Sequence, residues 1–162
     1  MPLFGTEANN EVVSLDHGTS QTGYVWVRDC KIDHHGIIPN GELLEWCVGT
    51  ALEFPSIPFV FERMCSYGHT VGRTTFETVR WQGRFEQAIG PQRVTYISRV
   101  TVKKCLCGTS YRIADRQVRA AVIKKFGRYK DRLQGITSHR WQALALAIAF
   151  LEGARDVEKE AA

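Results

Sequence analysis

The chain has 162 residues, a length typical of one domain and sufficient to bury a hydrophobic core. The formal net charge of +4 is unevenly distributed: residues 1–60 contain two basic and eight acidic residues, whereas residues 99–140 contain twelve basic and two acidic residues. This asymmetry indicates either a surface in the second half that faces a polyanion or a solvated helical face.

Five cysteines occur, and none forms a Cys-x-x-Cys pair. An odd number without that spacing argues against a disulfide framework or a structural zinc site. The chain contains no signal peptide that we can recognise and no apolar run long enough to span a bilayer. We therefore expect a protein of the reducing cytoplasm, with no membrane partner.

The first half of the chain predicts three strands, at residues 11–16, 24–28 and about 31–38, after a flexible leader at residues 1–10. Gly and polar residues separate them, and the short connections favour an antiparallel meander. Apolar residues at helical spacing then predict a helix that starts at Asn40 or Gly41 and ends before Pro55.

A fourth strand is expected at residues 57–61, and it stops at Glu62. A strand reached through a helix is normally parallel to an earlier strand. If it lies beside the first strand, Glu62 and Asp16 share the carboxyl edge of the sheet, where open α/β sheets bind ligands. The alternative is that Asp16 only caps the turn that follows it.

The second half predicts one more strand and four helices. The helix after a loop at residues 67–72 is expected to be capped by Thr74 or Thr75, and a fifth strand follows at residues 93–97. A short helix capped by Thr101, a helix capped by Asp115 and a last helix capped by Ser138 complete the pattern. We expect a mixed sheet with helices on both faces, forming one domain over residues 11–156, and a frayed tail at residues 157–162.

Several short motifs occur in a particular order along almost the whole of this pattern. They are Leu15-Asp16-His17-Gly18, Phe59-Val60-Phe61-Glu62, Val102-Lys103-Lys104-Cys105-Leu106-Cys107-Gly108, Gln117-Val118 and His139-Arg140-Trp141-Gln142-Ala143-Leu144-Ala145-Leu146-Ala147. In order and spacing they resemble the RuvC-type Holliday-junction resolvases, and more narrowly the phage and prophage members of that group.

The resemblance implies an α/β, ribonuclease-H-like fold with a five-stranded sheet of order 3-2-1-4-5. It further implies a homodimer that nicks opposing strands of a four-way DNA junction, using divalent metal ions, in a bacterial or phage-infected cytoplasm. A metal-dependent endodeoxyribonuclease acting on branched DNA is therefore the function that we expect, with no nucleotide cofactor.

Two Mg²⁺ ions about 3.5–4 Å apart can serve both ends of an in-line displacement at phosphorus. The resemblance assigns the ligands to Asp16, Glu62, His139 and Gln142, although the family carries acidic residues at the last two positions, with a His at the first of them in some relatives. Loss of carboxylate there weakens Mg²⁺ binding and can favour Mn²⁺, which tolerates nitrogen ligands. His139 can instead orient the attacking water, and both side chains can also be plain helix residues.

Basic residues complete the expected site. Lys103 matches a basic position of the family and can neutralise the scissile phosphate, or it can be a solvated lysine. Relatives often carry a further lysine just before the Gln-Val pair, where this chain has Ala114 and Asp115. Arg116 can replace that charge with a different geometry.

The basic second half predicts contacts to DNA phosphates, which give affinity and recognise shape more than sequence. Tyr67 lies where relatives place an aromatic that stacks on an unpaired base, and it can equally be a surface loop residue. The expected DNA-binding residues are Tyr67, His69, Arg73, Arg80, Lys104, Arg112 and Arg116.

Two other functions are compatible with the sequence. The first is a junction-binding protein of the same fold that cleaves poorly, because Gln142 and the Ala114-Asp115 pair depart from the family pattern. The second is an ATPase, since Asp-x-Gly-Thr at residues 16–19 also opens the phosphate loop of sugar kinases and actin-like proteins. Those enzymes need two such domains, and this chain has length for one.

Overall fold

The computed structural model describes residues 10–126, 133 and 135–157, so most of the predicted leader and tail lie outside the described residues. Within the described part, five strands form one sheet with the order β3-β2-β1-β4-β5, as predicted. The strands are β1 (Glu11–His17), β2 (Gln21–Arg28), β3 (Lys31–Pro39), β4 (Phe59–Arg63) and β5 (Val94–Ser98).

The strand directions follow from the connections. Tight turns make β2 antiparallel to both β1 and β3, whereas helical crossovers make β4 parallel to β1 and β5 parallel to β4. The central strand β1 is covered on both faces. This is why residues 12–15 form an unbroken buried run instead of an alternating pattern.

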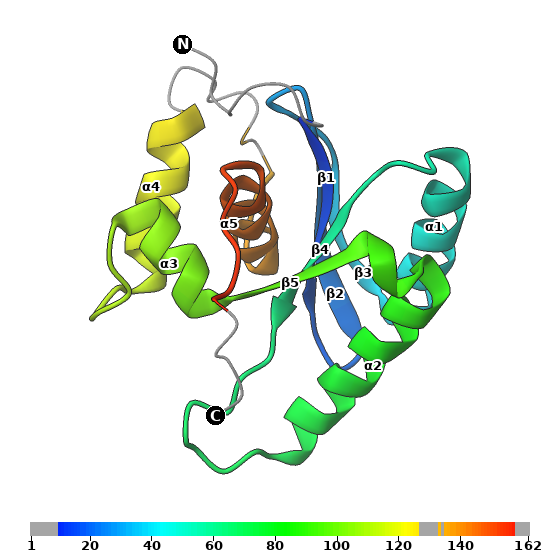
Figure 1. The fold of residues 1–162 in the computed structure, drawn as a ribbon, viewed down its shortest axis with the longest axis horizontal. Coiled ribbons are helices and arrows are strands. Elements are labelled where there is room, and N and C mark those ends of the chain that lie inside the picture. Colours follow the sequence, from blue (N-terminus) through cyan, green and yellow to red (C-terminus); the bar gives the residue numbers. More distant parts are fainter. Residues whose placement is uncertain (1–9, 127–132, 134, 158–162) are drawn as a thin grey trace.

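Helices cover both faces of this sheet (Figure 1). On one side lie α1 (Asn40–Glu53) and α2 (Arg73–Ile89); on the other lie α3 (Arg99–Cys107), α4 (Asp115–Phe126) and α5 (His139–Leu151). Each side has its own hydrophobic cluster. Residues 143–149 of α5 are all buried, so this helix is the core of its layer.

The structure corrects several predicted element ends. Strand β4 runs to Arg63, two residues further than predicted, so Glu62 is part of the strand. Helix α2 starts after Gly72 without a threonine cap, and α3 is capped by Ser98 rather than Thr101. Asp115 begins α4 but bonds the Arg99 side chain, and Ser138 precedes α5 without making a side-chain cap bond.

Within the described residues, no helix is long and apolar enough to cross a bilayer.

Candidate active site

Strand register brings Asp16 and Glu62 together. Leu15 on β1 is the parallel partner of Phe61 on β4, the last pair of this ladder, and Asp16 and Glu62 are the residues that directly follow it on the two strands. Leu15 and Phe61 belong to the cluster under α1 and α2. Because successive strand side chains alternate between faces, Asp16 and Glu62 point to the other face, toward α3 and α5.

Both carboxylates are mostly shielded from solvent, with side chains 15% and 18% exposed. Burial raises the pKa of Asp16 above its ordinary value. Burial, reinforced by repulsion from Asp16, raises the pKa of Glu62 to about 7. Two buried acids that oppose each other's ionisation form a site where a cation is favourable, because it stabilises both charged forms.

His139 reaches this pair from the first turn of α5. Its Nδ1 lies 3.0 Å from Asp16 Oδ2, and its side chain is 66% exposed. When Nδ1 donates to the carboxylate, the lone pair of Nε2 is available to solvent, to a metal ion or to the proton of a water molecule.

The close approach of α5 depends on a glycine. Gly23 on β2 is the antiparallel partner of Asp16, and a Cβ atom at Gly23 would lie 2.9 Å from the Cβ of His139. Any larger residue would therefore push the start of α5 away from Asp16. We did not predict this role from the sequence, where Gly23 reads only as part of a turn.

Arg99, at the start of α3, is a site residue that we did not predict from the sequence. Its guanidinium donates to Gln142 Oε1 and to Asp115 Oδ1, and it lies 3.6 Å from Glu62 Oε2. The Arg99 side chain is 26% exposed. A positive charge thus enters the site from the first residue of α3, whereas Lys103 and Arg116 were the basic residues predicted there.

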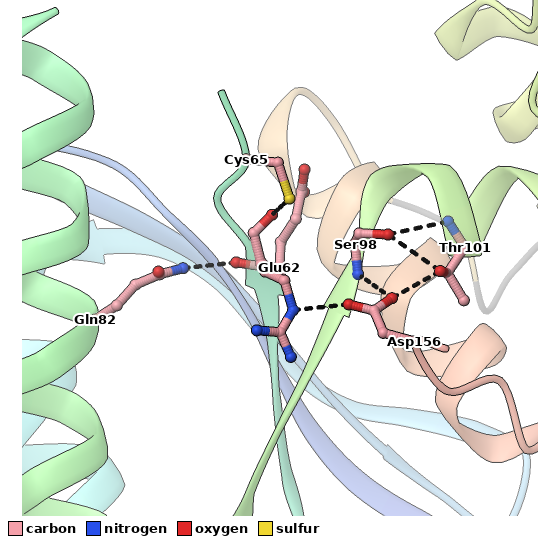
Figure 2. Close-up of polar contacts among 7 residues, drawn as sticks. Glu62, Cys65, Gln82, Ser98, Thr101 and Asp156 are labelled. Carbon is pink, nitrogen blue, oxygen red and sulfur yellow. Dashed lines mark hydrogen bonds and ion pairs between the residues drawn. The ribbon is translucent and has the colours of Figure 1, made fainter. Parts of the chain in front are cut away.

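Asp156 fixes the start of α3. Its carboxylate accepts hydrogen bonds from the backbone N–H of Ser98 and the hydroxyl of Thr101, as Figure 2 shows, and it also pairs with Arg63 at 2.7 Å. On the opposite side, the Gln82 amide of α2 donates to the backbone oxygen of Glu62 at 2.6 Å. These contacts hold the backbone on both sides of Glu62.

Neither protein-family models nor curated protein sequences match this chain. Solved structures, in contrast, match it over most of its length. A Thermus thermophilus RuvC in complex with a Holliday junction substrate superposes with a TM-score of 0.69 at 18% identity, over 90% of this chain and 94% of that one. A second Thermus thermophilus RuvC structure superposes with a TM-score of 0.66 at 17% identity, over 86% of this chain and 92% of that one.

The chain has the RuvC fold. At this level of identity the likeness lies in the architecture.

Lys103 and Tyr67 are electrostatically linked to Glu62 in this part of the RuvC fold. Lys103, on α3, is partly exposed, and its charge lowers the pKa of Glu62, opposing the effect of burial. Tyr67 is 56% exposed, in a left-handed backbone conformation with φ +48°. Partial burial, then Cys65 and Glu62, raise the pKa of its phenol.

The other expected DNA-binding residues lie on the surface of the fold. Arg73 pairs with Glu77 within α2 at 3.0 Å, and the Arg112 guanidinium lies 5.1 Å from the ring centroid of Tyr111. The four that remain are all exposed: His69, Arg80, Lys104 and Arg116.

The donor set suits a hard divalent cation that is also bound by substrate. Mg²⁺ is commonly held by one or two carboxylates together with substrate phosphates, and Asp16 and Glu62 supply that number. His139 adds a nitrogen donor, whereas the Gln142 oxygen is engaged by Arg99. In the described ranges, no three His, Cys, Asp or Glu side chains form a ready-made metal cluster.

Proposed function

We propose that this protein is a metal-dependent endodeoxyribonuclease that nicks branched DNA, with four-way junctions as its main substrate. The observation that carries the proposal is the convergence of Asp16, Glu62 and His139 at the carboxyl edge of a RuvC-fold sheet. Support also comes from the neighbouring sequence motifs, which resemble those of phage and prophage RuvC-type resolvases.

Mg²⁺ or Mn²⁺ is the proposed cofactor, held by Asp16, Glu62 and His139. Such an ion supplies Lewis-acid polarisation of the phosphate and an acidified water. Side chains of the protein would orient the reacting groups and stabilise their charge. Asp16 accepts a hydrogen bond from His139 Nδ1 and so turns Nε2 toward the ion that it would hold. Lys103 and Arg99 stabilise the charge that develops on the phosphate oxygens.

We propose DNA contacts through the exposed basic residues and Tyr67, on both sides of this site. Because phosphate contacts dominate, junction affinity should fall steeply with salt. Symmetric nicking of two strands requires two sites related by a two-fold axis, so we propose that the protein acts as a homodimer in the cytoplasm.

A second candidate is a junction-binding protein with weak cleavage. The specific observation in its favour is that the Gln142 side chain is neutral and that its oxygen accepts a hydrogen bond from Arg99. Cleavage of a synthetic junction separates the two functions, whereas both predict junction binding.

The test is nicking of a labelled four-way junction in Mg²⁺ or Mn²⁺, compared with a linear duplex of the same sequence. We expect paired nicks in the junction only. Asp16→Asn should abolish cleavage and leave junction affinity within a few-fold. Glu45→Gln, an acid-to-amide change at an exposed site on α1, should cleave like the wild type. Full cleavage by Asp16→Asn would contradict the proposed chemistry.

A further inference from the structure

The positive charge of Arg99 lies among oxygens that a metal ion would otherwise bind. Its guanidinium contacts three groups from three helices or strands: Glu62 on β4, Gln142 on α5 and Asp115 on α4. We propose that Arg99 takes the place of one of the two metal ions expected at this site, so the protein binds a single divalent ion. This inference rests on the proposed function.

The geometry divides the site into two halves. Asp16 bonds His139 and makes no hydrogen bond to Arg99, although the Arg99 charge acts on it electrostatically. Gln142 and Asp115 bond Arg99 directly, and Glu62 lies between the halves as its ion partner. The groups left for a divalent ion are therefore Asp16, Glu62 and His139.

The charges support the same division. Three carboxylates meet at this site, since Arg99 contacts both Glu62 and Asp115, and Asp16 lies at the same edge of the sheet. One divalent ion and one guanidinium neutralise three carboxylates. A second divalent ion would leave an excess of positive charge in a partly buried site, next to Lys103, where like charges repel more strongly than in water.

Arg99 is held in place by its neighbours. It is the first residue of α3, directly after Ser98, whose backbone N–H is bonded by Asp156 and whose hydroxyl caps the helix. The side chain is three-quarters shielded from solvent. An arginine cannot be deprotonated in a protein, so this charge is present at every working pH.

A guanidinium and a metal ion differ in what they contribute. The guanidinium offers several donors in one plane, which match two oxygens of a phosphate, but it cannot activate a water molecule. In this arrangement Arg99 would bind the phosphate on the Glu62 side, while the water is activated on the Asp16 side. Arg99 is then a catalytic residue that positions the phosphate.

The test counts bound ions directly, without DNA and independently of activity. Protein stripped of metal by a chelator is titrated with Mn²⁺, and binding is followed by calorimetry and by the loss of the free-ion electron spin resonance signal. We expect one Mn²⁺ per wild-type chain. Arg99→Met, which frees Glu62, Gln142 and Asp115, should bind two over the same concentration range.

Two further variants make the result specific. Adding Asp115→Asn to Arg99→Met removes a carboxylate from the freed half and should return the count to one. Arg119→Met removes an equal charge from an exposed position on α4 and should bind one ion, like the wild type. Asp115 is 66% exposed, so its substitution should not prevent folding.

Two ions on the wild-type chain would overturn the inference without any variant, as would a single ion on Arg99→Met. Either result leaves the nuclease proposal intact, provided that the wild type cleaves junctions and Asp16→Asn does not. A wild-type chain that binds no Mn²⁺ and does not cleave would overturn both.

Discussion

Substitution of Gly23 by alanine tests whether the start of α5 must approach Asp16 as closely as it does. A Cβ at this position lies 2.9 Å from His139 Cβ and 3.1 Å from its backbone carbon and oxygen. Carbon atoms pack optimally about 3.5–4.0 Å apart, so α5 must retreat by roughly 0.6–1 Å. A side-chain rotation cannot remove this overlap, because two of the three contacts are to backbone atoms of His139.

The retreat should affect both stability and catalysis. Overpacking of this kind costs about 1–3 kcal/mol. For a chain of this size, each kcal/mol lowers the melting temperature by about 2–4 °C. A displacement approaching 1 Å at a catalytic group can lower the rate by about a hundredfold. We therefore expect Gly23→Ala to melt a few degrees lower and to nick junctions far more slowly, with junction affinity little changed.

The assay pairs melting curves with single-turnover cleavage of a four-way junction. Gly49→Ala is the matched control: Gly49 lies inside α1, and a Cβ there meets nothing within 4 Å. That control should gain about 0.5–1 kcal/mol, because glycine is unfavourable inside a helix. If Gly23→Ala melted and cleaved like the wild type, the proposed contact between α5 and Asp16 would not matter for function.

Two other predictions concern the pH dependence of stability and the hydrogen bonds of Asp156 at the start of α3. The pKa of Glu62 is raised to about 7 in the folded protein, so the folded state binds more protons, and its stability should fall as pH rises from about 5 to about 8 without metal. The free energy of unfolding should fall by up to about 3 kcal/mol over this range, and Glu62→Gln should make it depend less on pH. Asp156→Asn should cost about 1–3 kcal/mol, since hydrogen bonds to Ser98, Thr101 and Arg63 are weakened. Burial opposes ionisation of Asp156, but those hydrogen bonds outweigh it and lower the pKa of this carboxyl, so the stability that Asp156 contributes should be lost as pH falls below about 4. The control Asp29→Asn, at an exposed turn, should melt like the wild type.

The sheet and the acidic pair could be predicted from the sequence because each depends on local patterns. Strand and turn residues give the meander, and a helical crossover makes the fourth strand parallel. Those two rules make β4 parallel to an earlier strand, and the strand order implied by the family resemblance placed it beside β1, which brings Asp16 near Glu62. The exact strand ends were less predictable: the apolar run from Ile57 suggested an earlier start for β4, whereas the hydrogen-bonded ladder begins at Phe59.

The roles of Arg99, Asp115 and Gly23 could not be predicted in the same way. Arg99 and Asp115 are sixteen residues apart, and their contact depends on how α3 and α4 pack. The reach of a long arginine side chain leaves no periodic signal in a sequence. The contact of Gly23 with His139 likewise appears only once α5 lies across the sheet.

The hydrogen bond between Asp16 and His139 joins residues 123 positions apart. Contacts with such long separations form late, because the entropy of closing the intervening chain must be overcome first. A nascent chain on the ribosome can therefore build the β1–β3 meander long before α5 emerges. The proposed DNA-cutting centre can assemble only after nearly the whole domain has been synthesised, so a partly synthesised chain would lack the proposed nuclease activity.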